Sequence, residues 1–138
     1  RTGALHRAGI IFIFNSRGEI FMQHRAKKET FPDCFDASCA FHVAFGETYE
    51  EAAERELFEE LGIRAELKLI SRFTHFDPPE NEIVAVFIGH SDETPEVDPE
   101  EAYSGEWCMP DRLNKTISEG RVTPWLRDGW KSMQGLPP

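Results

Sequence analysis

The sequence contains no apolar run close to the roughly 18 residues that a membrane-spanning helix needs. It also lacks the charged, apolar and small-residue regions of a secretory signal peptide. These two absences argue against membrane proteins and secreted proteins. We therefore expect no membrane partner and a cytoplasmic location.

Cysteine is scarce, with only Cys34, Cys39 and Cys108. The number is odd and no pair has the C-x-x-C spacing, so neither a disulfide framework nor a zinc site is indicated. Reduced thiols of this kind are typical of intracellular proteins.

Basic residues are also few, since 15 Lys and Arg stand against 25 Asp and Glu and give a net charge of −10. A strongly acidic surface repels phosphate backbones, so nucleic acid is not expected as a partner. The chain has no internal repeat, low-complexity tract or linker. Its 138 residues suit one domain that buries about two-thirds of its unfolded surface. We predict a single domain over residues 1–138.

The most informative stretch covers residues 41–63, and its core is a Glu-rich segment with a clear helix start. Thr48 followed three residues later by Glu51 predicts a capping box, in which each side chain satisfies a backbone amide of the first helical turn. Gly62 is a typical helix stop. At about 100° per residue, one apolar stripe forms along the predicted helix: Tyr49, Ala53, Leu57 and Leu61.

Glu56, Glu59 and Glu60 lie on a neighbouring arc of the same helix, because residues three and four apart are surface neighbours. Each close pair of like charges costs roughly 0.2–0.5 kcal/mol, which suggests that a cation offsets the repulsion. Oxygen ligands favour hard divalent ions, Mg²⁺ first and Mn²⁺ second. The alternative is a solvated helix face, which is where charged residues usually lie.

A fixed spacing surrounds these glutamates. Glu47 precedes Arg55 by eight residues, and Arg55 is followed by Glu56-Leu57, then Glu59-Glu60, then Gly62-Ile63. This frame resembles the signature of the Nudix family, G-x5-E-x7-R-E-U-x-E-E-x-G-U, where U is a bulky aliphatic residue. Every fixed position matches except the first, where this chain has Phe41 in place of Gly.

The resemblance implies an α/β fold, specifically an α/β/α sandwich with a mixed β-sheet. It also implies hydrolysis of a diphosphate linkage in a nucleoside diphosphate joined to another group, so the expected partner is a small diphosphate substrate. Many relatives are dimers, which leaves a homodimer open, although no stripe in this chain requires one.

The resemblance further assigns roles to individual residues. Glu56, Glu59, Glu60 and the carbonyl of Ala40 would hold the metal. Glu59 and Arg55 count among the expected catalytic residues, because Arg55 is placed to pair with Glu59 and fix its geometry. Glu101 lies on an acidic loop, where it would reach the metal or act as the base; a solvated surface loop is the alternative. Glu47 would support the loop before the helix.

Short β-branched and aromatic runs predict the sheet. A first hairpin is expected from 10–14 and 19–25, and a further strand from 35–43. The remaining predicted strands cover 66–76, 82–90 as the central strand, and 106–109. Helices are predicted over 110–118 and from Pro124 onward, since Pro favours the first helical turn.

Three residues are candidate substrate contacts. Arg25 ends the first hairpin beside Lys27 and Lys28, and its planar fork suits phosphate oxygens; a solvated hairpin end is the alternative. His42 contacts substrate or is a structural histidine. Phe76, with Phe73 and His75, ends a strand as an aromatic platform for a flat ring, or simply packs in the core.

A second resemblance is to isopentenyl-diphosphate isomerases, which share the Nudix fold, and it rests on residues 5–8 (LHRA) and 38–42 (SCAFH). There His6 and His42 would be metal ligands, and a Cys would stand two residues before the second His. Position 40 is Ala here, and Cys39 is one residue away. One residue along a strand reverses the face. Isomerase activity is therefore the second interpretation, the runner-up to hydrolysis.

A third interpretation is a binding module without catalysis. Gly is used where the backbone bends or approaches a ligand closely, and Phe41 in its place would close the pocket. Against this interpretation stands the intact set of glutamates, which destabilises the helix when no cation is bound.

Overall fold

The computed structural model describes residues 5–25, 31–77, 80–100 and 102–134. Its elements, in chain order, are β1 (Leu5–Phe14), β2 (Ile20–Arg25), β3 (Phe35–Asp36), β4 (Cys39–His42), α1 (Tyr49–Leu61), β5 (Lys68–Asp77), β6 (Glu80–His90), β7 (Ala102–Cys108), α2 (Pro110–Ser118) and α3 (Pro124–Met133). None of the helices in this part of the chain has the length and apolar character needed to span a bilayer.

All seven strands belong to one sheet, which is mixed as predicted. Its main path runs β3-β2-β1-β6-β5, while β4 pairs with β1 and β7 pairs with β2. β1 and β6 are parallel, and the other neighbours are antiparallel. β6 lies between β1 and β5, so the prediction of a central strand there is confirmed.

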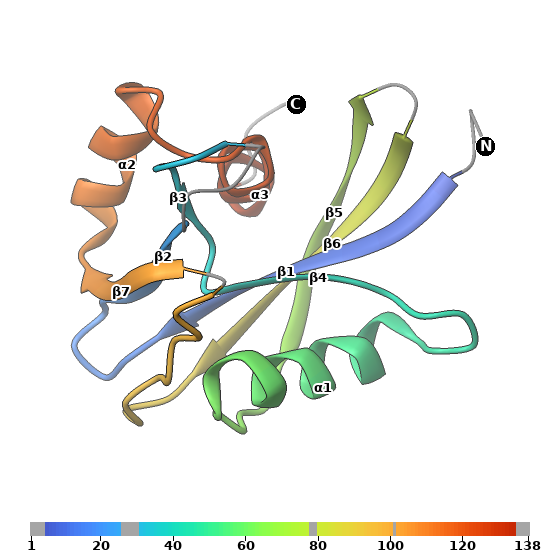
Figure 1. Cartoon of the computed structure of the whole chain (residues 1–138), viewed down its shortest axis with the longest axis horizontal. Coiled ribbons are helices and arrows are strands. Elements are labelled where there is room, and N and C mark those ends of the chain that lie inside the picture. Colours follow the sequence, from blue (N-terminus) through green and yellow to red (C-terminus); the bar gives the residue numbers. More distant parts are fainter. Residues whose placement is uncertain (1–4, 26–30, 78–79, 101, 135–138) are drawn as a thin grey trace.

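The sheet carries a core on each face because side chains alternate along β1. Ile10 and Phe12 belong to the core that includes Trp130 of α3. Ile11 and Ile13 belong to the other core, with Leu57 of α1. Figure 1 shows α1 on one side of the sheet, with α2 and α3 on the other. The predicted α/β/α sandwich is therefore confirmed.

Helix α1 begins and ends where local signals predicted. Thr48 accepts a hydrogen bond from the Glu51 amide, and the Glu51 carboxylate accepts one from the Thr48 amide. Gly62 has the left-handed backbone (φ 69°) that ends the helix without a Cβ penalty. The predicted apolar stripe packs on the sheet, with Ala53, Leu57 and Leu61 buried.

The prediction of one continuous strand over 35–43 is wrong, because this segment forms two short strands, β3 and β4. Side chains interrupt the ladder between them. The Ser38 hydroxyl accepts a hydrogen bond from the Ile13 amide at 2.9 Å, and the Asp36 carboxylate accepts one from the Ala37 amide at 2.8 Å. The first hairpin is confirmed only at its closed end, where Phe14 faces Ile20, because β2 then pairs with β7.

The Phe41 side chain faces α1, and Phe41 also lines a cavity on the other side of its strand. Its side chain is buried in the core beneath α1, and its partner across the β1–β4 ladder is Gly9. A Cβ on Gly9 would lie only 2.3 Å from the Phe41 ring. The ring therefore covers the space that a side chain at position 9 would take, and the two residues form a complementary pair.

We predict that Gly9→Ala destabilises the protein by about 1–3 kcal/mol, because the added methyl overpacks against the Phe41 ring. In a Phe41→Ala background the same change should cost much less, since the clash is gone. Urea unfolding of the two single variants and the double variant measures the coupling energy. Additive effects would contradict the pairing of these two residues.

Candidate metal and active site

The predicted metal-binding glutamates lie together on one recess. Glu56, Glu59 and Glu60, on α1, line a cavity of about 240 Å³ that is completed by Gln23 of β2 and by Asp98. Asp98 belongs to the loop before β7, and its carboxylate accepts the Glu100 amide at 2.9 Å. The recess therefore brings helix carboxylates and a loop carboxylate to one place. A larger cavity of about 340 Å³, beside Leu57 and Ile63, contains none of the predicted site residues in its lining.

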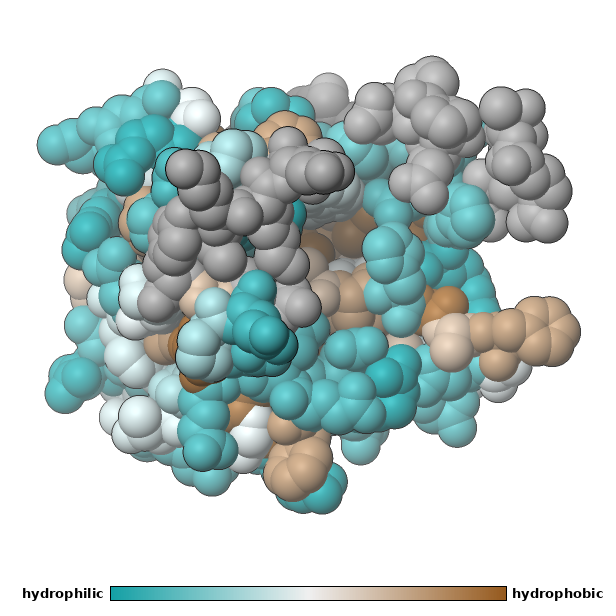
Figure 2. Space-filling model, in the orientation of Figure 1, coloured by the Kyte–Doolittle hydropathy of each residue, from teal (hydrophilic) through white to brown (hydrophobic). Residues whose placement is uncertain are grey.

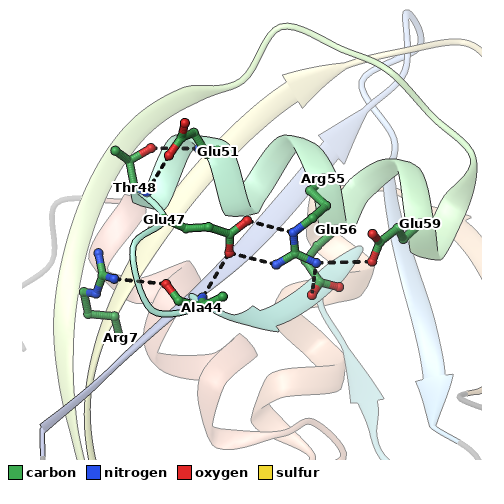
Figure 3. A network of polar contacts seen from close by, with 8 residues as sticks. All are labelled: Arg7, Ala44, Glu47, Thr48, Glu51, Arg55, Glu56 and Glu59. Carbon is green, nitrogen blue, oxygen red and sulfur yellow. Dashed lines mark hydrogen bonds and ion pairs between the residues drawn. The ribbon is translucent and has the colours of Figure 1, made fainter.

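Arg55 organises the acidic side of α1. Its guanidinium donates to both carboxylate oxygens of Glu47, at 2.8 and 2.9 Å. The same group donates to Glu56 at 3.0 Å and to Glu59 at 3.2 Å (Figure 3). These hydrogen bonds lower the pKa of Glu47 to about 2 and raise the pKa of Arg55.

Glu47 in turn fixes the loop before the helix. It accepts the Ala44 amide at 3.0 Å, while Arg7 donates to the Ala44 carbonyl at 3.3 Å (Figure 3). The Glu47 carboxylate thus joins the loop to the middle of α1, and Arg7 ties the same loop to β1. Arg55 partly offsets the repulsion expected among the helix glutamates. A protein cation therefore supplies part of the positive charge for which the sequence suggests a metal ion.

The donor set nevertheless fits a hard divalent ion, because the recess is lined by four carboxylates and one amide. Among the described residues no three potential ligands are already gathered in a metal-binding arrangement. Arg55 contacts Glu56 and Glu59, and Cys39 contacts Glu60, so a bound ion would share these carboxylates with their protein partners.

Cys39 lies behind the recess. Its Sγ is 3.4 Å from Glu60 Oε2 and donates to it. The side chain is fully buried in β4, and burial, with Glu60 nearby, raises the pKa of the thiol well above its usual range. Cys39 is therefore a neutral hydrogen-bond donor, and not a thiolate, beside a predicted metal ligand.

A groove leads away from the recess along β4. Glu60 and Gln23 also line a smaller cavity with Arg25, Asp36 and Ala40. Arg25 Nη1 lies 3.5 Å from Asp36, whose carboxylate also accepts the Thr123 hydroxyl at 3.0 Å. Burial raises the pKa of Asp36. Ala40 is exposed to the groove, so its position is consistent with a carbonyl near the metal.

The groove shares Arg25, Asp36 and Ala40 with a chamber of about 200 Å³ between the sheet and α3. Figure 2 shows apolar residues in a hollow near the centre of this face, with hydrophilic residues around it. His42 lies in its lining with Nε2 2.9 Å from Glu82 Oε2, and Trp125 donates to Glu82 Oε1 at 3.0 Å. These two hydrogen bonds, His42 first, lower the pKa of Glu82.

The recess, the groove and the chamber bring together most of the predicted site residues. Glu101, Lys27 and Lys28 lie outside the described residues, as does the side chain of Phe76, whose backbone is in β5.

Sequence reasoning missed Asp98, Gln23, Glu82 and Trp125. Glu82 is the first residue of the strand predicted over 82–90, and Trp125 lies in the helix predicted from Pro124 onward. A buried Glu inside an apolar strand was the one available signal, because such a residue needs partners.

We predict that Glu47→Gln lowers the melting temperature at neutral pH, because the charge-assisted pair with Arg55 is lost. The pKa of Glu47 is depressed from 4.5 to about 2 on folding. Its contribution is therefore complete above pH 4.5 and lost as the pH falls toward 2. In thermal unfolding between pH 7 and 2, the melting temperatures of the wild type and of Glu47→Gln should converge as the pH falls. Glu54→Gln, at an exposed position of the same helix, is the control. A difference in melting temperature between the wild type and Glu47→Gln that does not change with pH would refute the pairing.

A second prediction concerns Cys39. Cys39→Ala removes the donor to Glu60 and should weaken Mn²⁺ binding by about tenfold, the usual effect of losing a ligand's hydrogen-bond partner. Cys39→Ser keeps a donor and should bind Mn²⁺ more tightly than the Ala variant. Calorimetric titration measures this directly, with unfolding curves as the check on stability. Equal affinity in all three proteins would show that the thiol only fills space.

Comparison with known proteins gives relatives of two kinds. An isopentenyl-diphosphate Delta-isomerase from Serratia proteamaculans is 40% identical over 134 residues, which cover 91% of this chain and 75% of that protein. A Nudix hydrolase from Deinococcus radiodurans is 34% identical over 115 residues, covering 80% of this chain and 67% of that protein. The sequence relatives therefore do not resolve hydrolase from isomerase.

Solved structures and a family model agree on the fold. The crystal structure of DR0079 from Deinococcus radiodurans has a TM-score of 0.78 and 31% identity, covering 89% of this chain and 79% of that one. A MutT protein from Methanosarcina mazei, at 19% identity and a TM-score of 0.79, covers 95% and 94% and shares the fold. The NUDIX domain model matches residues 4–126. The chain belongs to the Nudix family.

Proposed function

We propose that the protein hydrolyses a diphosphate linkage in a nucleoside diphosphate joined to another group. The observation that carries this proposal is the recess on α1, where Glu56, Glu59 and Glu60 border one cavity that continues into a groove lined by Arg25. Carboxylates beside an arginine suit a metal-assisted phosphate reaction, in which oxygen ligands hold the ion and a guanidinium binds phosphate.

The ion would be Mg²⁺ first and Mn²⁺ second, held by the three glutamates and the Ala40 carbonyl. When bound, it supplies positive charge that offsets the phosphate oxygens and favours ionisation of the attacking water. Arg55 fixes Glu59 through its hydrogen bond, and Glu47 fixes Arg55. Arg25 binds the phosphate oxygens nearer the chamber.

In the reaction, the oxygen of a water molecule forms a new bond to one phosphorus, and the bond from that phosphorus to the bridging oxygen breaks. A carboxylate accepts the proton of the water. We assign this role to Glu101 or to Glu59; Asp98, which borders the recess, is a further carboxylate within this region. Two phosphate-containing products leave.

The contacts of β4 favour hydrolysis over isomerisation. In the isomerase reading an acid–base thiol would occupy position 40, on the face that borders the groove, but Ala40 stands there. Cys39 lies on the opposite face, is buried and donates to Glu60. His6 pairs in register with Glu82, and His42 contacts Glu82, so part of the isomerase pattern is present without its thiol. The binding-module reading loses support, because Phe41 packs against α1.

Release of nucleoside monophosphate from nucleotide sugars, dinucleotides and nucleoside di- and triphosphates, with Mg²⁺ or EDTA, tests the proposal. We expect turnover with Mg²⁺, none with EDTA, and a loss of at least about 100-fold in Glu59→Gln and Glu60→Gln, the scale of one lost electrostatic contact in catalysis. Glu54→Gln is the matched control on the same helix. Isomerisation of isopentenyl diphosphate without hydrolysis would favour the runner-up, and silence in both assays would favour a binding module.

A further inference from the structure

The chamber beside Glu82 is a distinct part of the groove. It shares Arg25, Asp36 and Ala40 with the small cavity next to the metal recess. A substrate whose diphosphate lies between Glu60 and Arg25 would therefore direct its remaining group along β4 into this chamber. We call it the Glu82 chamber.

The size of the Glu82 chamber limits what enters it. Its volume is about 200 Å³, whereas a cavity of about 150 Å³ accommodates one benzene ring. One six-membered ring fits with space around it, and a purine, with its second ring, fits less easily. The chamber is thus a site for a small group.

The walls of the chamber suit a flat ring. Ala8 and Val84 supply apolar surface from the sheet, and the Trp125 side chain borders the chamber from α3. The Trp125 indole is held by its hydrogen bond to Glu82 and by an edge contact with Phe31, with ring centroids 5.4 Å apart. A fixed indole offers a stacking surface at little entropic cost.

Glu82 supplies the polar recognition. Its side chain is only 8% exposed, and each of its oxygens accepts one hydrogen bond, from His42 and from Trp125. A carboxylate has about four acceptor positions, so it accepts further donors and repels acceptors. An ionised glutamate in a small chamber therefore discriminates between groups of equal shape that differ in donor and acceptor.

On the proposed function as its basis, we propose that the Glu82 chamber binds the nucleobase and selects a single ring carrying an amino group. Cytosine fits this description, because its amino group donates to a carboxylate in the way that Glu or Asp reads cytosine in other complexes. Uracil has the same shape but presents a carbonyl oxygen at that position, and purines fit the chamber less easily. Glu82 is therefore the specificity-determining residue.

The test uses substrates that differ only in the base. We would measure kcat/KM with Mg²⁺ for CDP-glucose, UDP-glucose and ADP-glucose, and the affinities of CMP and UMP by calorimetry without metal. The wild type should prefer the cytosine substrate over the uracil substrate by about fivefold or more, the low end of the discrimination from one good base contact. Hydrolysis of ADP-glucose should be weaker still.

Glu82→Gln is the decisive variant. It keeps the size and the acceptor for Trp125 but adds a donor, so the ratio of cytosine to uracil should fall to near one or invert. Glu119→Gln, an exposed residue paired with Arg121, is the control and should keep the wild-type ratio. If Glu82 had only a structural role, the substitution would lower kcat/KM equally for both substrates and leave their ratio unchanged. That result would overturn the proposal.

The two arms separate this inference from the hydrolase itself. Hydrolysis of all three substrates at similar rates, or a preference for uracil, would overturn the role of the chamber and leave the hydrolase intact. No hydrolysis of any substrate would overturn the proposed function, and the CMP and UMP affinities would then decide on the chamber alone. Equal affinities there would overturn it.

Discussion

The guanidinium of Arg55 lies among three carboxylates, and the geometry of the acidic recess depends on how it divides its hydrogen bonds between them. Glu47 takes the paired contact, while Glu56 and Glu59 take single ones. Because Glu47 also binds the Ala44 amide, the loop before α1 and the helix surface form one network. The negative charges are therefore kept close together without an added ion, which prepares the helix to receive one.

This arrangement has a chemical cost and a benefit. Glu56 and Glu59 must shift part of their bonding from Arg55 to an incoming ion, which weakens the net gain of binding. In return, each carboxylate is already held near its working position, so fewer side-chain rotations must be restricted when the ion binds. Glu60 is held in the same way, by a hydrogen bond from the Cys39 thiol.

Local structure was the predictable part of this protein. Thr48, Gly62 and Pro124 mark helix ends through hydrogen bonds and backbone preferences that involve only nearby residues, and the helices begin or end at them. The Glu-rich frame likewise predicted that Glu56, Glu59 and Glu60 share one arc of the helix, and the three side chains line one recess.

The Glu82 chamber was not predictable in the same way. Glu82 and Trp125 are 43 residues apart and meet only because β6 lies beside β1 in parallel register while α3 packs across the sheet. Such proximity depends on tertiary packing, which one sequence does not encode in any short pattern. The break between β3 and β4 has a similar origin, since it depends on Ser38 reaching Ile13 across the sheet.

Strand β4 has two faces with different tasks. Cys39 and Phe41 are buried toward α1, whereas Ala40 and His42 are exposed on the side of the groove and chamber. Substitutions at odd and even positions of this short strand therefore act on separate parts of the molecule. A lineage carrying this strand is able to exchange the groups that meet the substrate while the support behind the metal ligands stays unchanged. That separation gives one physical route by which close relatives with the same fold come to perform different reactions.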